Sequence, residues 1–188
     1  TKCYNIQLIF ESNYNLQSLH NNLSVISSIG LESIELIVPY DHNFNYITIV
    51  EKYKNISFIF VYNSPEDKYV KEQFCGLQQV LFSTKDLRLT KNKSLDFFNV
   101  HILLFTESQN RNTYFKRKLY IGKNGEIKNA EETTTIFGNL NTLKQVDDIL
   151  KIINTSEFQK YWHIHKGLID VCKDCEFRYM CTDCRVFI

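Results

Sequence analysis

The sequence predicts a two-part α/β protein, in which a parallel sheet of partial (β/α) barrel type precedes a small cysteine-rich module. Three observations predict this fold class. Short apolar runs alternate with stretches of helical spacing in the first half, a glycine-containing hairpin pattern follows, and four cysteines fall within thirteen residues near the C-terminus. We place the boundary after residue 110, so the first part is residues 1–110 and the second is residues 111–188.

The first part opens with a strand and a helix. An apolar run at residues 4–10 predicts the strand. The helix has an apolar stripe formed by Leu16, Leu19, Leu23 and Ile26, with Gly30 where a C-terminal cap belongs. Apolar runs at residues 34–38 and 56–62 predict two buried strands, and residues 47–53 predict a helix between them. Strands that alternate with helices build right-handed βαβ units and a parallel sheet.

The pattern weakens after Pro65. Residues 79–83 predict a fourth strand, residues 84–96 a polar loop, and residues 100–105 a fifth strand that carries His101, which we interpret as a structural histidine. A closed eight-stranded barrel typically needs about 250 residues. We therefore expect an open sheet or a half-barrel.

The second part begins with a hairpin. Residues 117–121 and 126–129 flank a turn that contains Gly122 and Gly125, and Gly138-Asn139 predicts another turn. Thr142 and Gln145 resemble a capping box for a helix whose apolar stripe is Leu143, Val146, Ile149, Leu150 and Ile153. A short helix at residues 156–162 then precedes the cysteines.

Composition excludes two classes of partner. The 188 residues carry a net charge of +1 with lysines, arginines and carboxylates interleaved, so nothing attracts a nucleic acid. Neither an apolar run of membrane-spanning length nor a signal segment is present in the printed sequence, so we predict a cytoplasmic protein that binds no membrane. Since the chain opens at Thr1 inside a strand pattern, we expect an N-terminal part beyond it.

The four clustered cysteines predict a metal site. They form two CxxC pairs, Cys172 with Cys175 and Cys181 with Cys184. Four thiolates can hold tetrahedral zinc or an iron–sulfur cluster, and in a cytosolic chain such clustering favours metal ligation over disulfides. The other cysteines, Cys3 and Cys75, stand alone in apolar surroundings, which is typical of buried core thiols.

Several polar residues surround this cluster. His163 and His165 are either alternate residues of an extended segment, or alternative ligands or donors to the ligands. Lys173, Arg178 and Arg185 either offset the charge of the thiolates or are surface charges. The sequence contains no GxGxxG, Walker or nucleophile-elbow motif, so we assign no catalytic residue and no organic cofactor.

Four stretches of the second part form a recognisable pattern, and they are residues 112–118 (NTYFKRK), 124–129 (NGEIKN), 137–139 (FGN) and 172–185 (CKDCEFRYMCTDCR). With these stretches the second part resembles the SPASM domain, the C-terminal module of radical-SAM peptide-modifying enzymes. More narrowly, it is similar to the peptide maturases of grasp-with-spasm systems. The resemblance implies a [4Fe–4S] cluster, a ribosomally made precursor peptide as the bound partner, and an ATP-grasp ligase of the same system.

Departures from the family pattern limit this resemblance. Typical SPASM domains hold two clusters, and relatives carry cysteines where this chain has Tyr114 and Ala130. We therefore expect one centre, ligated by Cys172, Cys175, Cys181 and Cys184. The radical-SAM CxxxCxxC triplet is absent from the printed residues, so either it precedes them or the chain has kept the module and lost the radical chemistry.

Three functions follow from these observations. The first is a peptide-maturation protein that binds its precursor at an exposed sheet edge, or between sheet and module, and works with the ligase. The second is a radical-SAM peptide-modifying enzyme whose catalytic half lies outside this sequence. The third is a zinc-stabilised interaction scaffold. The sequence leaves open whether the chain is an enzyme and whether its metal is zinc or iron–sulfur.

Overall fold

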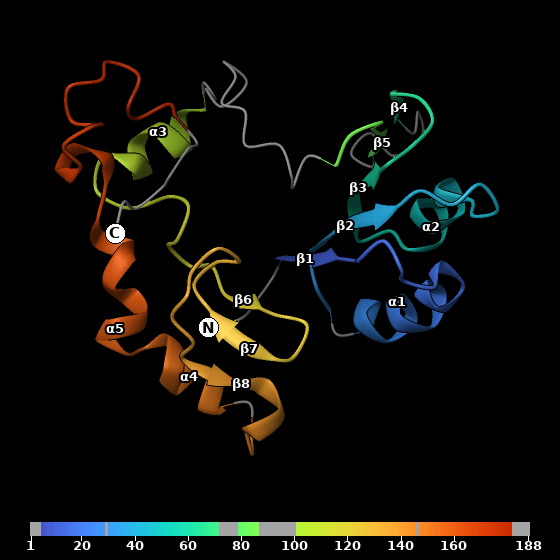
Figure 1. Cartoon of the computed structure of the whole chain (residues 1–188), viewed down its shortest axis with the longest axis horizontal. Helices are drawn as coiled ribbons and strands as arrows, with labels where there is room; N and C mark the ends of the chain where they lie inside the picture. Colours follow the sequence, from blue (N-terminus) through green and yellow to red (C-terminus); the bar gives the residue numbers. More distant parts are fainter. Residues whose placement is uncertain (1–4, 29, 72–78, 87–100, 146, 182–188) are drawn as a thin grey trace. The chain divides into compact units, whose positions relative to one another are not determined.

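The structure is a computed structural model that describes residues 5–28, 30–71, 79–86, 101–145 and 147–181. The chain divides into two compact units, Thr1–Lys91 and Asn92–Ile188 (Figure 1). Each unit is presented by itself below. Cys3, Cys75 and Cys184 lie outside the described residues, and so do Arg185, Val146 and most of the expected polar loop at 84–96.

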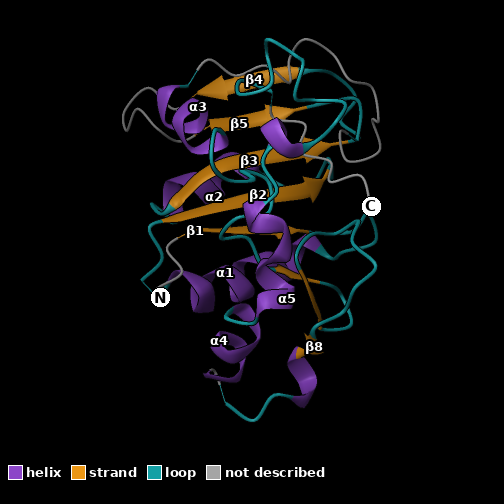
Figure 2. Cartoon of the chain, turned by 90° about the vertical axis from the view of Figure 1, so that its left-hand side faces the viewer, coloured by secondary structure: helices purple, strands orange, loops and turns teal. Residues whose placement is uncertain are grey.

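The first unit is built on an open, mostly parallel sheet of five strands. Its spatial order is β1-β2-β3-β5-β4, and Figure 2 shows the strands lying edge to edge. The strands are β1 (Asn5–Ile9), β2 (Ser33–Pro39), β3 (Ile56–Tyr62), β4 (Lys68–Lys71) and β5 (Gln79–Phe82). The first three and β5 are parallel, whereas β4 pairs antiparallel with β5 at the edge. The expectation of an α/β unit with a parallel sheet is confirmed, while closure into a barrel is not seen.

Two helices connect the first three strands. They are α1 (Leu19–Ser27), preceded by the 3-10 turn η1 (Leu16–Ser18), and α2 (Tyr46–Lys52). Their apolar sides and one face of the sheet form a core of fourteen buried residues, namely Leu16, Leu19, Leu23, Ile34, Leu36, Val38, Tyr46, Ile49, Val50, Tyr53, Ile56, Ile59, Val61 and Val80. Alternate residues of β2 are fully buried because strand side chains point to opposite faces.

The second unit contains a three-stranded antiparallel sheet and short helices. Its strands are β6 (Tyr120–Ile121), β7 (Glu126–Lys128) and β8 (Gly138–Asn139), in the order β6-β7-β8. The helices are α3 (Ile102–Ser108), η3 (Leu140–Thr142), α4 (Asp147–Ile153), α5 (Ser156–Gln159), η4 (Lys160–His163) and η5 (Lys166–Leu168). Between β6 and β7 lies the predicted turn, where Gly125 has a positive φ of 85° that favours glycine.

Two local predictions were wrong, and one strand was missed. The run expected as a strand at 100–105 is helical from Ile102, and His101 caps this helix with Nδ1 accepting from the Leu104 N–H at 3.5 Å. Ile102 and Leu103 are 74% and 72% exposed, so the run does not form a buried strand. The edge strand β4 was not expected. Gly138-Asn139, expected as a turn, forms β8 and pairs with β7.

The start of α4 also differs from the prediction. Thr142 ends the 3-10 turn η3, where its hydroxyl donates to the Asn139 carbonyl, and α4 begins only at Asp147. Asp148 fixes the backbone that precedes α4, because its Oδ2 accepts from the N–H groups of Lys144 and Gln145 at 3.3 Å. A carboxylate in the first turn replaces the expected capping box. None of the helices in the described ranges is long and apolar enough to cross a membrane.

Candidate functional site

Residues 166–181, which we call the cysteine segment, consist of consecutive turns. The Cys175 N–H donates to the Cys172 carbonyl at 3.0 Å, so this CxxC pair spans one tight turn. The Arg178 N–H donates in turn to the Cys175 carbonyl at 3.2 Å, and the Cys181 N–H to the Phe177 carbonyl at 3.1 Å. The first two thiols thus stand at the ends of a turn, as in pairs that chelate one metal.

The burial of the cysteines is uneven. Cys175 is exposed, whereas Cys172 and Cys181 are half-buried. Within the part of the chain that the structure describes, no three histidine, cysteine, aspartate or glutamate side chains are gathered as a metal site. The donor set, all thiols, and the first turn suit zinc or an iron–sulfur cluster. The fourth expected ligand, Cys184, lies outside the described residues, so the complete ligand set stays a prediction.

Cationic side chains lie close to this segment. The Arg178 guanidinium donates to the Cys175 carbonyl at 2.9 Å. The buried Lys166 ammonium donates to the Cys181 carbonyl, and Lys173 pairs with Asp170 at 2.7 Å. Thus Arg178 contacts the backbone of an expected ligand, while Lys173 is engaged by a carboxylate.

The two histidines have separate surroundings. Arg111 donates to Nδ1 of His163, which links the residues after α3 to η4. The Nδ1 atom of His165 is buried and has no hydrogen-bond partner among the described residues. Neither histidine is brought together with two other candidate ligands in the described ranges.

A second apolar cluster contains Tyr114 and Ala130. Ala130 is 1% exposed and packs with Phe115 and Tyr161, whose ring centroids are 5.2 Å apart. Tyr114 joins the cluster through a 5.0 Å ring contact with Phe115, and the Lys118 ammonium lies 3.8 Å from the centroid of its ring. Aromatic packing therefore holds together the region around Tyr114 and Ala130.

The turn at Asn124 and Gly125 meets residues 139–141 in space. The Asn124 carbonyl accepts from Nδ2 of Asn139 at 3.0 Å and of Asn141 at 3.1 Å. A Cβ on Gly125 would lie 2.9 Å from Oδ1 of Asn139 and 2.8 Å from Nδ2 of Asn141. Glycine is therefore required at position 125 both by the positive φ and by this close approach.

The side chain of Asn112 fixes the backbone at residues 112–115. Its Oδ1 accepts from the N–H groups of Tyr114 and Phe115, at 3.0 and 3.2 Å. Its Nδ2 donates to the Ile164 carbonyl at 3.0 Å, and its own N–H donates to the Trp162 carbonyl at 3.0 Å. This buried amide ties the residues that follow α3 to the residues that precede the cysteine segment.

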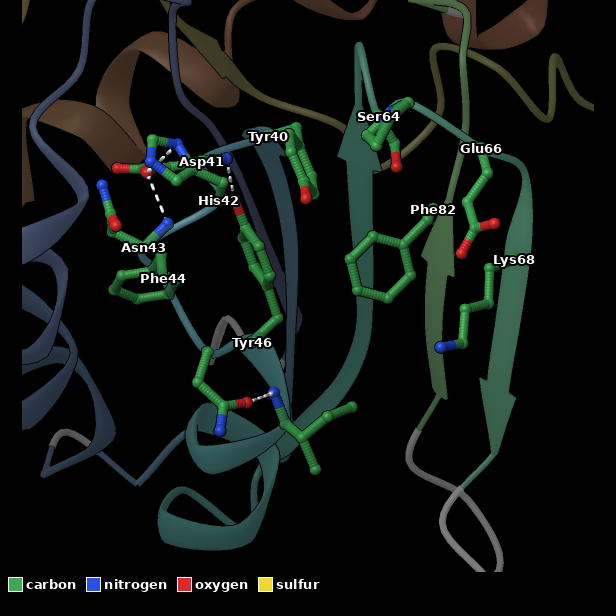
Figure 3. Close-up of a pocket in the computed structure, with 13 residues that line it drawn as sticks. Tyr40, Asp41, His42, Asn43, Phe44, Tyr46, Ser64, Glu66, Lys68 and Phe82 are labelled. Atoms are coloured by element: carbon green, nitrogen blue, oxygen red, sulfur yellow. Dashed lines mark hydrogen bonds and ion pairs between the residues drawn. The ribbon is translucent and has the colours of Figure 1, made fainter.

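The first unit contains a feature that the sequence reasoning missed. A pocket of about 350 Å³ opens where β2, β3 and β5 end, the edge at which open α/β sheets bind ligands. Figure 3 shows the residues that line it. They are Tyr40, Asp41, His42, Asn43, Phe44, Asn45, Tyr46, Ile47, Ser64, Pro65, Glu66, Lys68 and Phe82.

Tyr46 organises one wall of this pocket. Its hydroxyl donates to the Pro39 carbonyl and accepts from the Asp41 N–H, both at 2.7 Å. Burial raises the pKa of Tyr46 from 10.0 to about 12. Its ring lies 5.0 Å from that of Phe44 and 5.6 Å from that of Phe82, both edge-on. The wall is therefore rigid and aromatic.

Asp41 and Glu66 line the pocket from two different loops. Asp41 follows β2, and its Oδ1 accepts from the Asn43 N–H at 2.9 Å and lies 3.7 Å from Nδ1 of the exposed His42. Glu66 comes from the loop between β3 and β4, next to Lys68 at the start of β4 (Figure 3). Aromatic rings combined with two carboxylates are suited to a cationic group such as an amine or guanidinium.

The loop that carries Glu66 is held from both sides. Oδ1 of Asp67 accepts from the Thr84 N–H at 2.6 Å, and hydrogen bonds from Thr84 lower the pKa of Asp67. The Ser64 N–H donates to the Ser83 carbonyl at 2.8 Å. Polar residues directly after the strand ends at Pro39 and Tyr62 were the sequence signal that could have located this pocket.

Comparison of the chain with protein-family models, with curated proteins and with solved structures found no match. The functional assignment therefore depends on the residues of the cysteine segment and of the pocket.

Proposed function

We propose that this chain is a peptide-maturation protein that binds a ribosomally made precursor peptide and works with an ATP-grasp ligase in the cytoplasm. It carries one metal centre, ligated by Cys172, Cys175, Cys181 and Cys184, in a SPASM-like module. The observation that carries the peptide-binding part is the pocket at the carboxyl edge of the sheet, next to the edge strand β4. The resemblance of residues 112–185 to grasp-with-spasm maturases supports the rest.

The position of β4 supports binding of an extended peptide. Among the described strands β4 pairs only with β5, and its first residue, Lys68, also lines the pocket. An extended peptide that adds to β4 through backbone hydrogen bonds would pass the mouth of the pocket. A lysine or arginine side chain of that peptide would then reach Asp41 and Glu66, with its stem against the aromatic wall.

The order of the parallel strands supports the partial-barrel fold. Each of β1, β2, β3 and β5 lies beside the preceding one, which is the order of successive strands in a (β/α) barrel. The same order is compatible with the radical-SAM alternative, in which a CxxxCxxC triplet precedes these residues. Reading the complete gene tests that alternative, because a reading frame without the triplet eliminates it.

A zinc-stabilised scaffold is the second candidate, and the cysteine segment favours it. Leu168, Val171 and Phe177 are 65%, 77% and 45% exposed, so this segment buries little apolar surface. Segments of this kind are commonly held by a structural metal that performs no chemistry. The resemblance favours a [4Fe–4S] cluster, so the identity of the metal separates the two candidates.

The peptide-binding proposal is tested with the full chain and the precursor peptide encoded next to its gene. We expect fluorescence anisotropy to show saturable binding. Because two charge-assisted contacts would be lost, the double substitution Asp41→Asn and Glu66→Gln should weaken binding at least about tenfold. Glu51→Gln removes a carboxylate from the exposed side of α2, outside the pocket, and should leave the affinity unchanged.

Two results would contradict the proposal. If the wild-type chain shows no measurable affinity for the precursor, peptide binding is wrong. If it binds but the double variant binds equally well, the peptide does not use this pocket. Co-purification of the ATP-grasp ligase with the tagged chain, strengthened by the precursor, would independently support the partnership.

A further inference from the structure

Lys166 is the only lysine, arginine, aspartate or glutamate in the described part of the chain that is buried, with 5% of its surface exposed. It lies in η5 (Lys166–Leu168), six positions before Cys172. Burying an ammonium group is so unfavourable that such groups are normally paired with a negative charge or lose their own. A negative charge near the Lys166 ammonium would therefore offset the cost of its burial.

The described residues supply only part of that compensation. The Lys166 ammonium donates to the Cys181 carbonyl, and no ion pair joins it to a carboxylate of the described ranges. An ammonium group has three donors, and a neutral carbonyl offers only a partial charge. Lys173 differs, because its Nζ lies 2.7 Å from Oδ1 of Asp170 and its side chain is 48% exposed.

The proposed metal centre would supply the negative charge that the described residues do not provide for Lys166. Zinc with four thiolates, or an oxidised [4Fe–4S] cluster with four thiolates, has a net charge of about −2. Cys181, whose carbonyl accepts from Lys166, is one of the expected ligands. A fixed cation at the backbone of a ligand stabilises such an anionic centre, as donors around metal ligands do generally.

We propose that the buried Lys166 ammonium is the counter-charge of a thiolate-ligated metal centre in the cysteine segment. The inference rests on the metal centre of the proposed function and adds a residue to it. Lys166 is a positioning residue, since it acts on the metal through Cys181. Without metal, Lys166 is a poorly compensated buried charge that destabilises the segment. With metal, its charge is matched, so metal binding and the burial of Lys166 reinforce each other.

The substitution Lys166→Met tests this coupling in the full-length chain. Methionine keeps the apolar stem and removes the charge. The readouts are the zinc affinity of metal-stripped, reduced protein, measured by chelator competition, and the thermal stability of the same protein without zinc. We expect zinc affinity to fall about 10- to 100-fold, the range for loss of a residue that supports metal ligands. The stability without zinc should be equal or higher, because an uncompensated buried charge is gone.

Two further variants make the result specific. Lys173→Met removes a charge from the same segment, but at an exposed ion pair, and should change zinc affinity by no more than about threefold. Lys166→Arg keeps the positive charge and should retain most of the affinity. Together these variants separate the buried charge of Lys166 from the general charge of the segment.

The possible outcomes test the role of Lys166 separately from the existence of the metal centre. If wild-type protein binds zinc tightly and Lys166→Met binds it equally well, the role of Lys166 is overturned and the metal centre stands. If Lys166→Met lowers stability without zinc and leaves zinc affinity unchanged, Lys166 is merely structural and the inference is wrong. If the wild type binds zinc no more tightly than a variant with Cys172→Ser and Cys181→Ser, the metal centre and the role of Lys166 are both wrong.

Discussion

The sheet of the first unit and the cysteine segment of the second differ in what holds them together. The sheet and its helices share a core of fourteen buried apolar residues, among them Leu36 and Ile59. The cysteine segment is a series of turns in which Leu168 and Val171 are exposed and Lys166 is buried. Hydrophobic burial can stabilise the sheet without a ligand, whereas under the proposed function the segment gains stability from a metal held by its thiols.

The largest expected effect is the loss of metal from the cysteine segment. Cys181→Ser removes one thiolate, and the site would lose a substantial part of the roughly 10–16 kcal/mol that zinc supplies to small zinc domains. We expect metal content to fall and amide exchange to become fast over residues 166–181, while amides in β2 and β3 keep their protection. Hydrogen exchange followed by mass spectrometry measures both regions in one experiment.

Cys75→Ala is the matched control for this prediction. Cys75 is expected to be a core thiol and not a ligand, so this variant should retain its full metal content. If Cys75→Ala loses metal, or if Cys181→Ser keeps both its metal and its slow exchange, the ligand assignment is wrong.

A smaller effect is expected from the core of the sheet. Leu36 is fully buried in β2, and Leu36→Ala should lower the free energy of unfolding of the first unit by about 2–5 kcal/mol. Metal content should not change, because the core is formed without the cysteine segment. Urea denaturation and metal analysis of the same preparation measure the two quantities. Val25→Ala, at a side chain that is 65% exposed in α1, should cost no more than about 0.5 kcal/mol.

The smallest effect concerns Tyr46, which links the core to the pocket. Since burial raises its pKa from 10.0 to about 12, the folded state holds the phenolic proton more tightly than the unfolded state. The stability that this proton contributes is complete below pH 10 and is lost as the pH rises through about 12. Tyr46→Phe should cost about 1–3 kcal/mol at neutral pH, because the buried Pro39 carbonyl and Asp41 N–H lose their partner.

Stability measurements at alkaline pH isolate the contribution of the Tyr46 phenolic proton. In Tyr46→Phe the stability should decline less steeply with pH between 10 and 12 than in the wild type, as measured by denaturant unfolding at each pH. Parallel declines would show that Tyr46 does not titrate in the way its burial implies. Tyr69→Phe, at an exposed position of β4, should change stability at neutral pH by no more than about 0.5 kcal/mol.

The sequence predicted the parts of the fold where apolar spacing is strong. Strands β2 and β3 were predicted within a residue of their bounds, because their apolar runs are buried between helices and neighbouring strands. The hairpin of β6 and β7 was predicted from a glycine-containing turn, in which Gly125 has the positive φ that favours glycine. Local patterns sufficed for these elements because burial and turn conformation act directly on the residues concerned.

Other elements depend on contacts that local patterns do not contain. The apolar run at 100–105 is too short for its period to distinguish a strand from a helix, and in the structure it leads into α3. Strand β4 has only four residues and depends on pairing with β5, and β8 likewise depends on β7. Asp41 and Glu66 line one pocket only because parallel strands end at the same edge of the sheet. Of the candidate metal site, the sequence supplies the ligand types and spacing, and the structure adds the turn between Cys172 and Cys175 and the buried Lys166.

The central claim is that the cysteine segment is organised by a metal, and metal analysis of anaerobically purified protein tests it most directly. Iron, zinc and acid-labile sulfide are measured per chain in the wild type and in the double variant with Cys172→Ser and Cys181→Ser. The account predicts one centre per chain, either one zinc ion or one [4Fe–4S] cluster, and its loss in the variant. Metal in the wild type at no more than the level of the variant would contradict it.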